Sequence, residues 1–132
     1  MSGVRLTVRV DFGAARALGP GKVRLLEAIG ATGSISRAGR ALGMSYRRAW
    51  LLVDDMNRSF RAAVVVTQGG GAKGGGAALT AFGRELIEKY RAIEARATAA
   101  TKPQLAALEG ALRGGARGQR KSVKTSIRPA AR

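Results

Sequence analysis

The sequence has no cysteine and no histidine. Without cysteine there are no disulfides, so nothing argues for an oxidising compartment. The two absences also exclude thiolate and imidazole metal sites, and they exclude Ser–His and Cys–His catalytic pairs. We therefore expect no metal site and no cofactor, and we do not expect an enzyme.

Long apolar runs are also missing. No segment approaches the roughly 18 apolar residues that a membrane helix requires. The first residues, "MSGVRLTVRV", alternate apolar and charged side chains where a signal peptide has an apolar core. We expect a cytoplasmic protein with no membrane partner.

Acidic residues are scarce relative to basic ones. The 132 residues include 24 Lys and Arg against 8 Asp and Glu, giving a formal net charge of +16. A compositional bias toward Arg, Ala and Gly accounts for part of this excess. The 45% apolar fraction is ordinary for a globular domain. The charge therefore points to a polyanionic partner, most simply double-stranded DNA.

The pattern of apolar residues predicts a mainly α fold with a small β component. Strict alternation over residues 4–10, with Val4, Leu6, Val8 and Val10 on one face, predicts a half-buried N-terminal strand. Pro20 suits the start of a helix that ends at Gly30 or Gly33. No small-molecule site is evident.

Residues 34–60 have the pattern of a helix-turn-helix. Ser34 and Ser45 are good N-caps, and Gly43 suits the end of the first helix. Ile35, Ala38 and Leu42 then form one apolar stripe, and Ala49, Val53, Met56 and Phe60 form another. The pattern predicts two helices joined by a turn of about three residues.

The second helix would then enter the DNA major groove with its first residues at the base edges. We expect base and phosphate contacts from Ser45, Tyr46, Arg47 and Arg48, and phosphate contacts from Ser34, Ser36 and Arg37. Arg40 is expected to be a solvated charge and Trp50 to pack between helices. Asp54 is expected to pair with Arg47 or Arg58.

The glycine-rich stretch "QGGGAKGGGA" lies between the strand-like segments "VVVT" and "ALT". This arrangement predicts a β-hairpin with a long tip, a wing, whose Lys73 contacts DNA. A plain loop is the alternative. The stretch does not fit a phosphate-binding P-loop, because no Ser or Thr follows Lys73 and no suitable helix begins there. A phosphoryl-transfer enzyme that uses this loop is a third, disfavoured alternative.

Thr80 is a good cap for a long helix over residues 80–100. Its apolar stripe predicts a dimerisation surface formed by Phe82, Leu86, Tyr90, Ile93 and Ala97; the alternative is that the helix packs over the N-terminal strand. Residues 1–100 are expected to form one domain. Residues 101–132 form a basic tail, expected to be disordered apart from a short helix in "LAALEGAL".

Two long segments, "LGPGKVRLLEAIGATGSISRAGRALGMSYRRAWLLVDDMN" and "GGGAKGGGAALTAFGRELIEKYR", resemble the N-terminal winged-helix domain of ModE-type molybdate-responsive regulators. That domain is related to LysR-type DNA-binding domains. The resemblance runs from about residue 4 to residue 97. It implies a homodimer held by the last helix and a recognition helix that opens at Ser45, Tyr46 and Arg47. It also implies transcriptional regulation, often of molybdenum uptake or use.

Members of that family that sense molybdate carry further oxyanion-binding domains, which residues 101–132 do not resemble. We therefore expect a nucleoid-associated, sequence-specific transcriptional regulator that does not itself hold molybdate. The main alternative is an architectural protein that coats DNA with little sequence preference, which the basic tail favours. Another is a protein-only partner that supplies its dimerisation helix to a full-length regulator.

Overall fold

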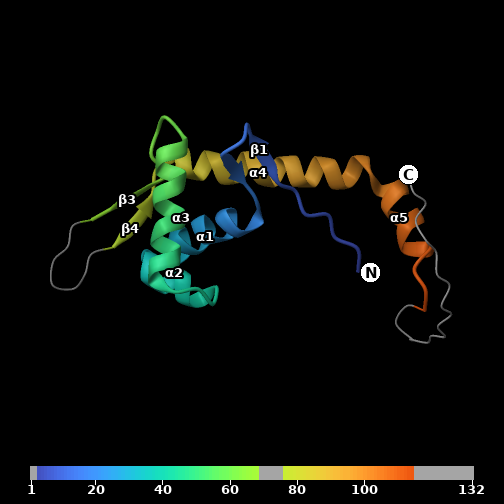
Figure 1. Ribbon diagram of the computed structural model, residues 1–132, viewed down its shortest axis with the longest axis horizontal. Helices are drawn as coiled ribbons and strands as arrows, with labels where there is room; N and C mark the ends of the chain where they lie inside the picture. The colour runs from blue at the N-terminus through green and yellow to red at the C-terminus, as the bar shows by residue number, and fades with distance from the viewer. Residues whose placement is uncertain (1–2, 69–75, 115–132) are drawn as a thin grey trace.

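The computed structural model describes residues 3–68 and 76–114. Over these residues the chain is mainly helical, with two small antiparallel hairpins (Figure 1). The expected fold class, a mainly α winged helix-turn-helix, is confirmed. The elements are β1 (Val10–Phe12), β2 (Arg16–Leu18), α1 (Pro20–Thr32), α2 (Ile35–Ala41), α3 (Tyr46–Ser59), β3 (Val65–Thr67), β4 (Ala77–Leu79), α4 (Ala81–Ala100) and α5 (Lys102–Gly110).

The core is formed by α1, α2, α3 and the first half of α4, with residues from β2, β3 and β4. Pro20 occupies the first turn of α1, where its missing N–H costs no helical hydrogen bond. The helix ends at Gly33, whose φ of 73° is left-handed and favours glycine. No polar or charged residue is buried among the described residues. The fully buried large side chains are Tyr90, Leu25, Leu26, Ile29, Met56, Val23 and Val64.

The predicted N-terminal strand is wrong in its position. Residues 3–9 form no strand; instead β1 pairs with β2, with Val10 opposite Leu18. The expected alternation of half-buried and exposed side chains does hold from Val4 to Val10. Within this segment Val8 packs against the core and accepts a hydrogen bond from Tyr90 of α4, so a helix rather than a neighbouring strand contacts it.

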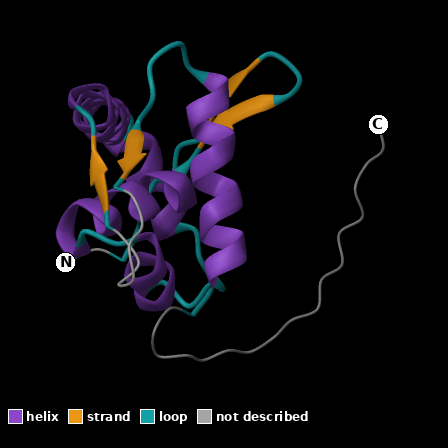
Figure 2. Ribbon diagram, turned by 90° about the vertical axis from the view of Figure 1, so that its left-hand side faces the viewer, coloured by secondary structure: helices purple, strands orange, loops and turns teal. Residues whose placement is uncertain are grey.

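The second hairpin, β3 and β4, has Val65 opposite Leu79 and forms the base of the predicted wing. Figure 2 shows α3 standing between the two hairpins. Asn57 on α3 holds β3: its Oδ1 accepts from the Val64 N–H at 2.7 Å and its Nδ2 donates to the Val65 carbonyl at 3.1 Å. Lys73, the residue expected at the wing tip, lies outside the described residues.

The long helix α4 begins at the predicted cap, where Thr80 Oγ1 accepts from the Gly83 N–H at 2.8 Å. Its first half packs on the core, and its second half leads away from the body to α5 (Figure 1). Gly83 permits the close packing, because a Cβ there would overlap the carbonyl oxygen of Val64. No helix in the described part of the chain is long and apolar enough to cross a membrane.

Candidate nucleic-acid interface

The predicted helix-turn-helix is formed by α2 and α3, and both predicted serine caps are present. Ser34 Oγ accepts from the Arg37 N–H and Ser45 Oγ from the Arg48 N–H, each at 3.0 Å. Each hydroxyl keeps its own hydrogen to donate, so capping leaves both serines able to bind a phosphate oxygen. Gly43 ends the α2 turn with a φ of 73°.

A second glycine sets how closely α2 and α3 cross. A Cβ on Gly39 would lie 3.1 Å from the Ala49 Cβ and 3.3 Å from the Met44 carbonyl oxygen. The Met44 N–H in turn donates to the Gly39 carbonyl at 2.9 Å. This contact fixes the start of α3 relative to the end of α2.

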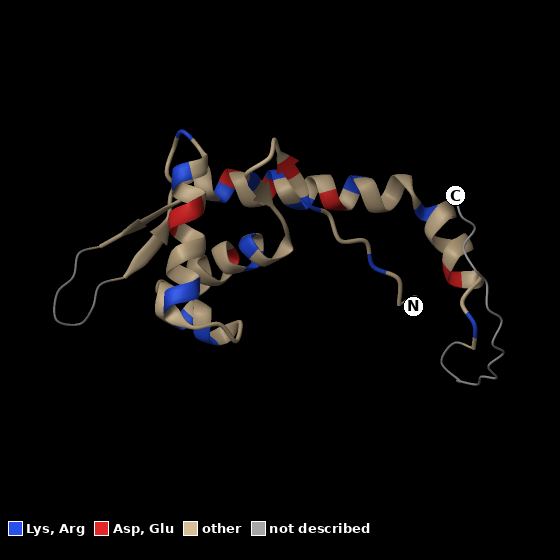
Figure 3. Ribbon diagram, viewed as in Figure 1, with Lys and Arg blue, Asp and Glu red and all other residues tan. Residues whose placement is uncertain are grey.

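Figure 3 shows basic residues, coloured blue on the ribbon, on α2 and at the start of α3. Arg37 and Arg40 on α2, and Arg47 and Arg48 on α3, are all exposed. None of the four guanidinium groups forms an ion pair within residues 3–68 and 76–114. The predicted contact residues other than Lys73 lie on α2, on α3 or at their N-caps, and all are exposed except the partly buried Ser34: Ser34, Ser36, Arg37, Ser45, Tyr46, Arg47 and Arg48.

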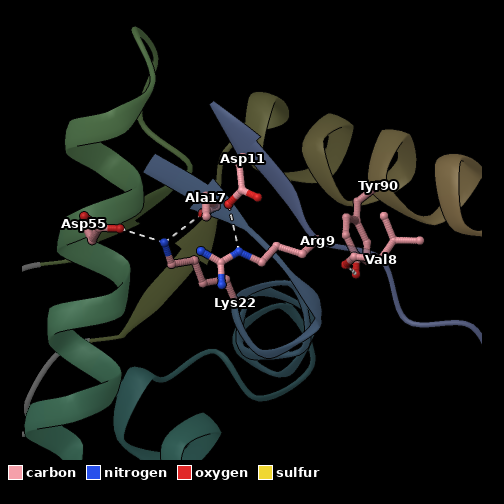
Figure 4. Close-up of polar contacts among 7 residues, drawn as sticks. All are labelled: Val8, Arg9, Asp11, Ala17, Lys22, Asp55 and Tyr90. Carbon is pink, nitrogen blue, oxygen red and sulfur yellow. Dashed lines mark hydrogen bonds and ion pairs between the residues drawn. The ribbon is translucent and has the colours of Figure 1, made fainter. Parts of the chain in front are cut away.

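Acidic groups on α3 come later along the helix and are neutralised. Asp54 pairs with Arg58 at 3.6 Å, which is one of its two expected partners. Asp55 accepts from Lys22 Nζ at 2.8 Å, and the same ammonium donates to the Ala17 carbonyl at 2.8 Å (Figure 4). The two Lys22 contacts hold α3 against α1 and β2. Since both aspartates come after residue 53, the first two turns of α3 carry no acidic group.

The expectation for Trp50 is wrong. Instead of packing between helices, its side chain is 42% exposed on α3, beside Leu51 at 46%. The reason is helical phase: Ala49, Val53 and Met56 are the buried positions of α3. Trp50 and Leu51 fall outside that stripe, and the regular 3.6-residue period could have revealed this from the sequence.

The five residues expected to form a dimer surface are split between two environments. Leu86 and Tyr90 are buried in the core of this chain, at 8% and 1% exposure. Phe82 packs on Phe60, with ring centroids 5.5 Å apart. Only Ile93, at 46% exposure, and the half-buried Ala97 lie on the part of α4 beyond the core.

An ionic cluster that the sequence did not indicate joins α4 to α1. Arg91 Nε and Nη2 donate to the two carboxylate oxygens of Glu27 at 2.9 and 2.8 Å, and its Nη1 donates to Glu94 at 2.6 Å. The hydrogen bonds from Arg91 lower the pKa of Glu27 despite its partial burial. Bidentate hydrogen bonding of this kind fixes the relative orientation of the two side chains in addition to pairing their charges.

Other classes of site have little support. Over the described residues, no group of three or more Asp and Glu side chains could hold a metal ion. An open groove of about 1090 Å³ lies between residues 4–7 and the second half of α4. The exposed basic residues of α2 and α3 are the candidate binding surface.

Comparisons with known proteins show what the chain is similar to. No protein-family model matches the sequence. The chain is 42% identical over 90 residues to the molybdenum transport protein ModE of Azotobacter vinelandii, a match that covers 68% of this chain and 33% of that protein. It is 53% identical over 78 residues to the molybdenum-pterin-binding protein MopB of Rhodobacter capsulatus, covering 59% and 29%.

A third relative is the DNA-binding transcriptional dual regulator ModE of Escherichia coli, 39% identical over 71 residues, covering 54% of this chain and 27% of that protein. The chain thus spans about a third of the length of these relatives. The three names describe regulators and molybdenum-related proteins rather than enzymes. This chain is therefore a homologue of the ModE molybdate-responsive regulators, and the match is consistent with a ModE-type DNA-binding domain.

Proposed function

We propose that the chain binds double-stranded DNA in a sequence-specific way, as a transcriptional regulator, with α3 in the major groove. The observation that carries the proposal is the set of four exposed arginines without ion-pair partners in the described residues, around the start of a capped helix. Such a helix start favours phosphate because the N–H groups of its first turn have no partner within the helix and the helix dipole is positive at this end.

The roles of the individual residues follow from their places. Arg47, exposed in the first turn of α3, is proposed to pair with a guanine, whose O6 and N7 accept from one guanidinium. Tyr46 and Arg48 flank it and are proposed to contact bases or phosphates. Ser34, Ser36 and Arg37 open α2 and Ser45 caps α3, and these residues are proposed to bind phosphate oxygens. Lys73 is proposed to reach the DNA from the wing.

A homodimer is proposed through the part of α4 that extends beyond the core. Ile93 and Ala97 are its surface-accessible apolar residues from the predicted set, while Leu86 and Tyr90 support the helix from within. Two copies related by a two-fold axis would match a palindromic site with two half-sites. The chain is proposed to act in the cytoplasm, on the nucleoid.

The relatives' names also suggest a link to molybdenum. We propose that this chain regulates genes of molybdenum uptake or use and that its DNA binding does not require molybdate. Equal affinity for the same site with and without added molybdate supports this view. A molybdate-dependent change in affinity would contradict it.

The second candidate is an architectural protein with little sequence preference. It is favoured by the net charge of +16, because charge alone gives strong non-specific binding. The two functions predict different roles for Arg47 in DNA binding. A base-reading Arg47 gives discrimination, whereas a phosphate-binding Arg47 gives affinity for every sequence.

The test compares Arg47→Ala with Arg58→Ala, a matched change near the far end of the same helix. We expect Arg47→Ala to weaken specific binding by about 1–3 kcal/mol and to relax the preference at one base pair. Arg58→Ala should leave the preference unchanged. An unaltered ratio of specific to non-specific affinity in Arg47→Ala would favour the architectural protein.

A further inference from the structure

Two large apolar side chains, Trp50 and Leu51, are exposed on the second turn of α3, at 42% and 46%. They are not needed for the core, since Ala49, Val53 and Met56 supply the buried face of this helix. Contiguous exposed apolar groups mark interaction sites, and Trp50 and Leu51 are consecutive on the helix that carries Arg47 and Arg48. The question is which partner chemistry this pair recognises.

Helical spacing places each of these apolar residues on the same face as a polar residue of the first turn. Leu51 follows Arg47 by four positions, and Trp50 follows Tyr46 by four, so each pair shares one face of α3. The members of a pair are about 6 Å apart along the helix axis, given the rise of about 1.5 Å per residue. A groove that receives Arg47 would therefore receive Leu51 as well.

The charges around the pair favour DNA over an apolar protein surface. Arg47 and Arg48 lie one turn earlier and are exposed without ion-pair partners in the described part of the chain. One turn later, Asp54 is paired with Arg58 and Asp55 with Lys22. A protein partner would have to cover these arginines along with the apolar pair. A DNA groove supplies negative phosphates and apolar groups together.

Only one base presents an apolar group in the major groove: thymine, through its C5-methyl. We propose that Leu51 and Trp50 recognise thymine methyl groups, and that the target sequence carries thymine beside the guanine read by Arg47. This inference rests on the proposed function and extends it. It makes the second turn of α3 a specificity determinant alongside the polar first turn.

The test replaces thymine by deoxyuridine, which removes the methyl group and keeps base pairing. A target site is first selected from a pool of random duplexes. Each thymine of that site is then replaced singly, and the Kd is measured for the wild type, Leu51→Ala and Trp50→Ala. We expect at least one replacement to weaken wild-type binding about fourfold, the effect of removing one buried methyl group. That replacement should have no effect on the variant lacking the contacting side chain.

Arg48→Ala serves as the matched control on the same helix. It should weaken binding to every duplex and keep the full sensitivity to uracil. Leu51→Met and Trp50→Phe retain an apolar group, and circular dichroism checks that all variants are folded. Leu51→Met and Trp50→Phe should therefore keep part of the dependence of binding on the thymine methyl group.

The outcomes separate this inference from the function on which it rests. A selected site that the wild type binds equally with thymine and uracil overturns the inference and leaves sequence-specific binding intact. Full methyl dependence in both alanine variants also overturns it. A pool from which no site is enriched refutes the sequence-specific function and this inference together.

Discussion

Tyr90 Oη donates a hydrogen bond of 2.6 Å to the carbonyl oxygen of Val8, joining residues 82 positions apart (Figure 4). Tyr90 is 1% exposed, so this bond ties the N-terminal segment to α4 from inside the core. The extended residues before β1 are thereby held against the helix that is proposed to form the dimer.

Replacing Tyr90 by Phe should lower the free energy of unfolding by about 0.5–1.5 kcal/mol, because the Val8 carbonyl loses its donor. Urea denaturation of the variant gives this value. Tyr46→Phe is the matched control, since Tyr46 is 56% exposed and should contribute little to stability. Equal stability of Tyr90→Phe and the wild type would show that water replaces the hydroxyl at no cost.

Acid should weaken the tie between α1 and α4. Hydrogen bonds from Arg91, with the charges of Arg91 and Arg24, hold the pKa of Glu27 below its ordinary value of 4.5. A carboxyl whose folded pKa lies below its unfolded pKa stabilises the fold above the unfolded value. This contribution is lost as the pH falls through the folded pKa.

The free energy of unfolding measured from pH 6 down to about pH 3 should therefore fall less steeply in Glu27→Gln than in the wild type. Glu85→Gln, a change at an exposed pair with Lys89, should have a smaller effect. Parallel pH profiles for the wild type and Glu27→Gln would contradict this role for the cluster.

Two glycines in first helical turns should respond in opposite ways to the same substitution. A Cβ on Gly83 would overlap the Val64 carbonyl oxygen, whereas a Cβ on Gly21 would meet nothing within 4 Å. Gly83→Ala should cost about 1–3 kcal/mol by forcing α4 away from the core. Gly21→Ala should be neutral or stabilise by up to about 1 kcal/mol. Thermal denaturation of the two variants measures both changes in stability. Equal stability of Gly83→Ala and Gly21→Ala would mean that α4 can shift to accommodate the added methyl group.

The basic residues after residue 114 should contribute non-specific affinity. Residues 115–132 contain six Lys and Arg and no acid. Changing all six to Gln in the full chain should make the plot of log Kd against log salt shallower, by about 0.9 for each phosphate that is no longer neutralised. The preference for the selected site should not fall. A reduced preference with an unchanged slope would place these residues in base recognition instead.

Local signals were enough to predict the helix-turn-helix. Ser34, Ser45 and Thr80 each cap the helix that the sequence assigned to them, because a cap depends on neighbours three residues away. The end of α1 at Gly33 and the break at Gly43 follow from the same short-range chemistry. The two strands at the base of the wing also lie where β-branched and small apolar residues predict them.

Features that depend on long-range contacts could not be predicted in this way. The alternation around Val8 was interpreted as a strand because the sequence does not show that α4 covers it. Tyr90 was assigned to a dimer surface because its apolar stripe does not reveal whether this chain or a second copy buries it. The bond between Arg91 and Glu27 spans 64 positions and leaves no periodic signal.

The most direct test of sequence-specific DNA binding is selection from a random duplex pool with the purified full chain near physiological salt. A specific regulator enriches one sequence, and a two-fold dimer enriches it as an inverted repeat. Arg47→Ala should then lose discrimination at one position in each half. Uniform recovery of all sequences by the wild-type protein would contradict the central claim and leave a protein that binds DNA by charge alone.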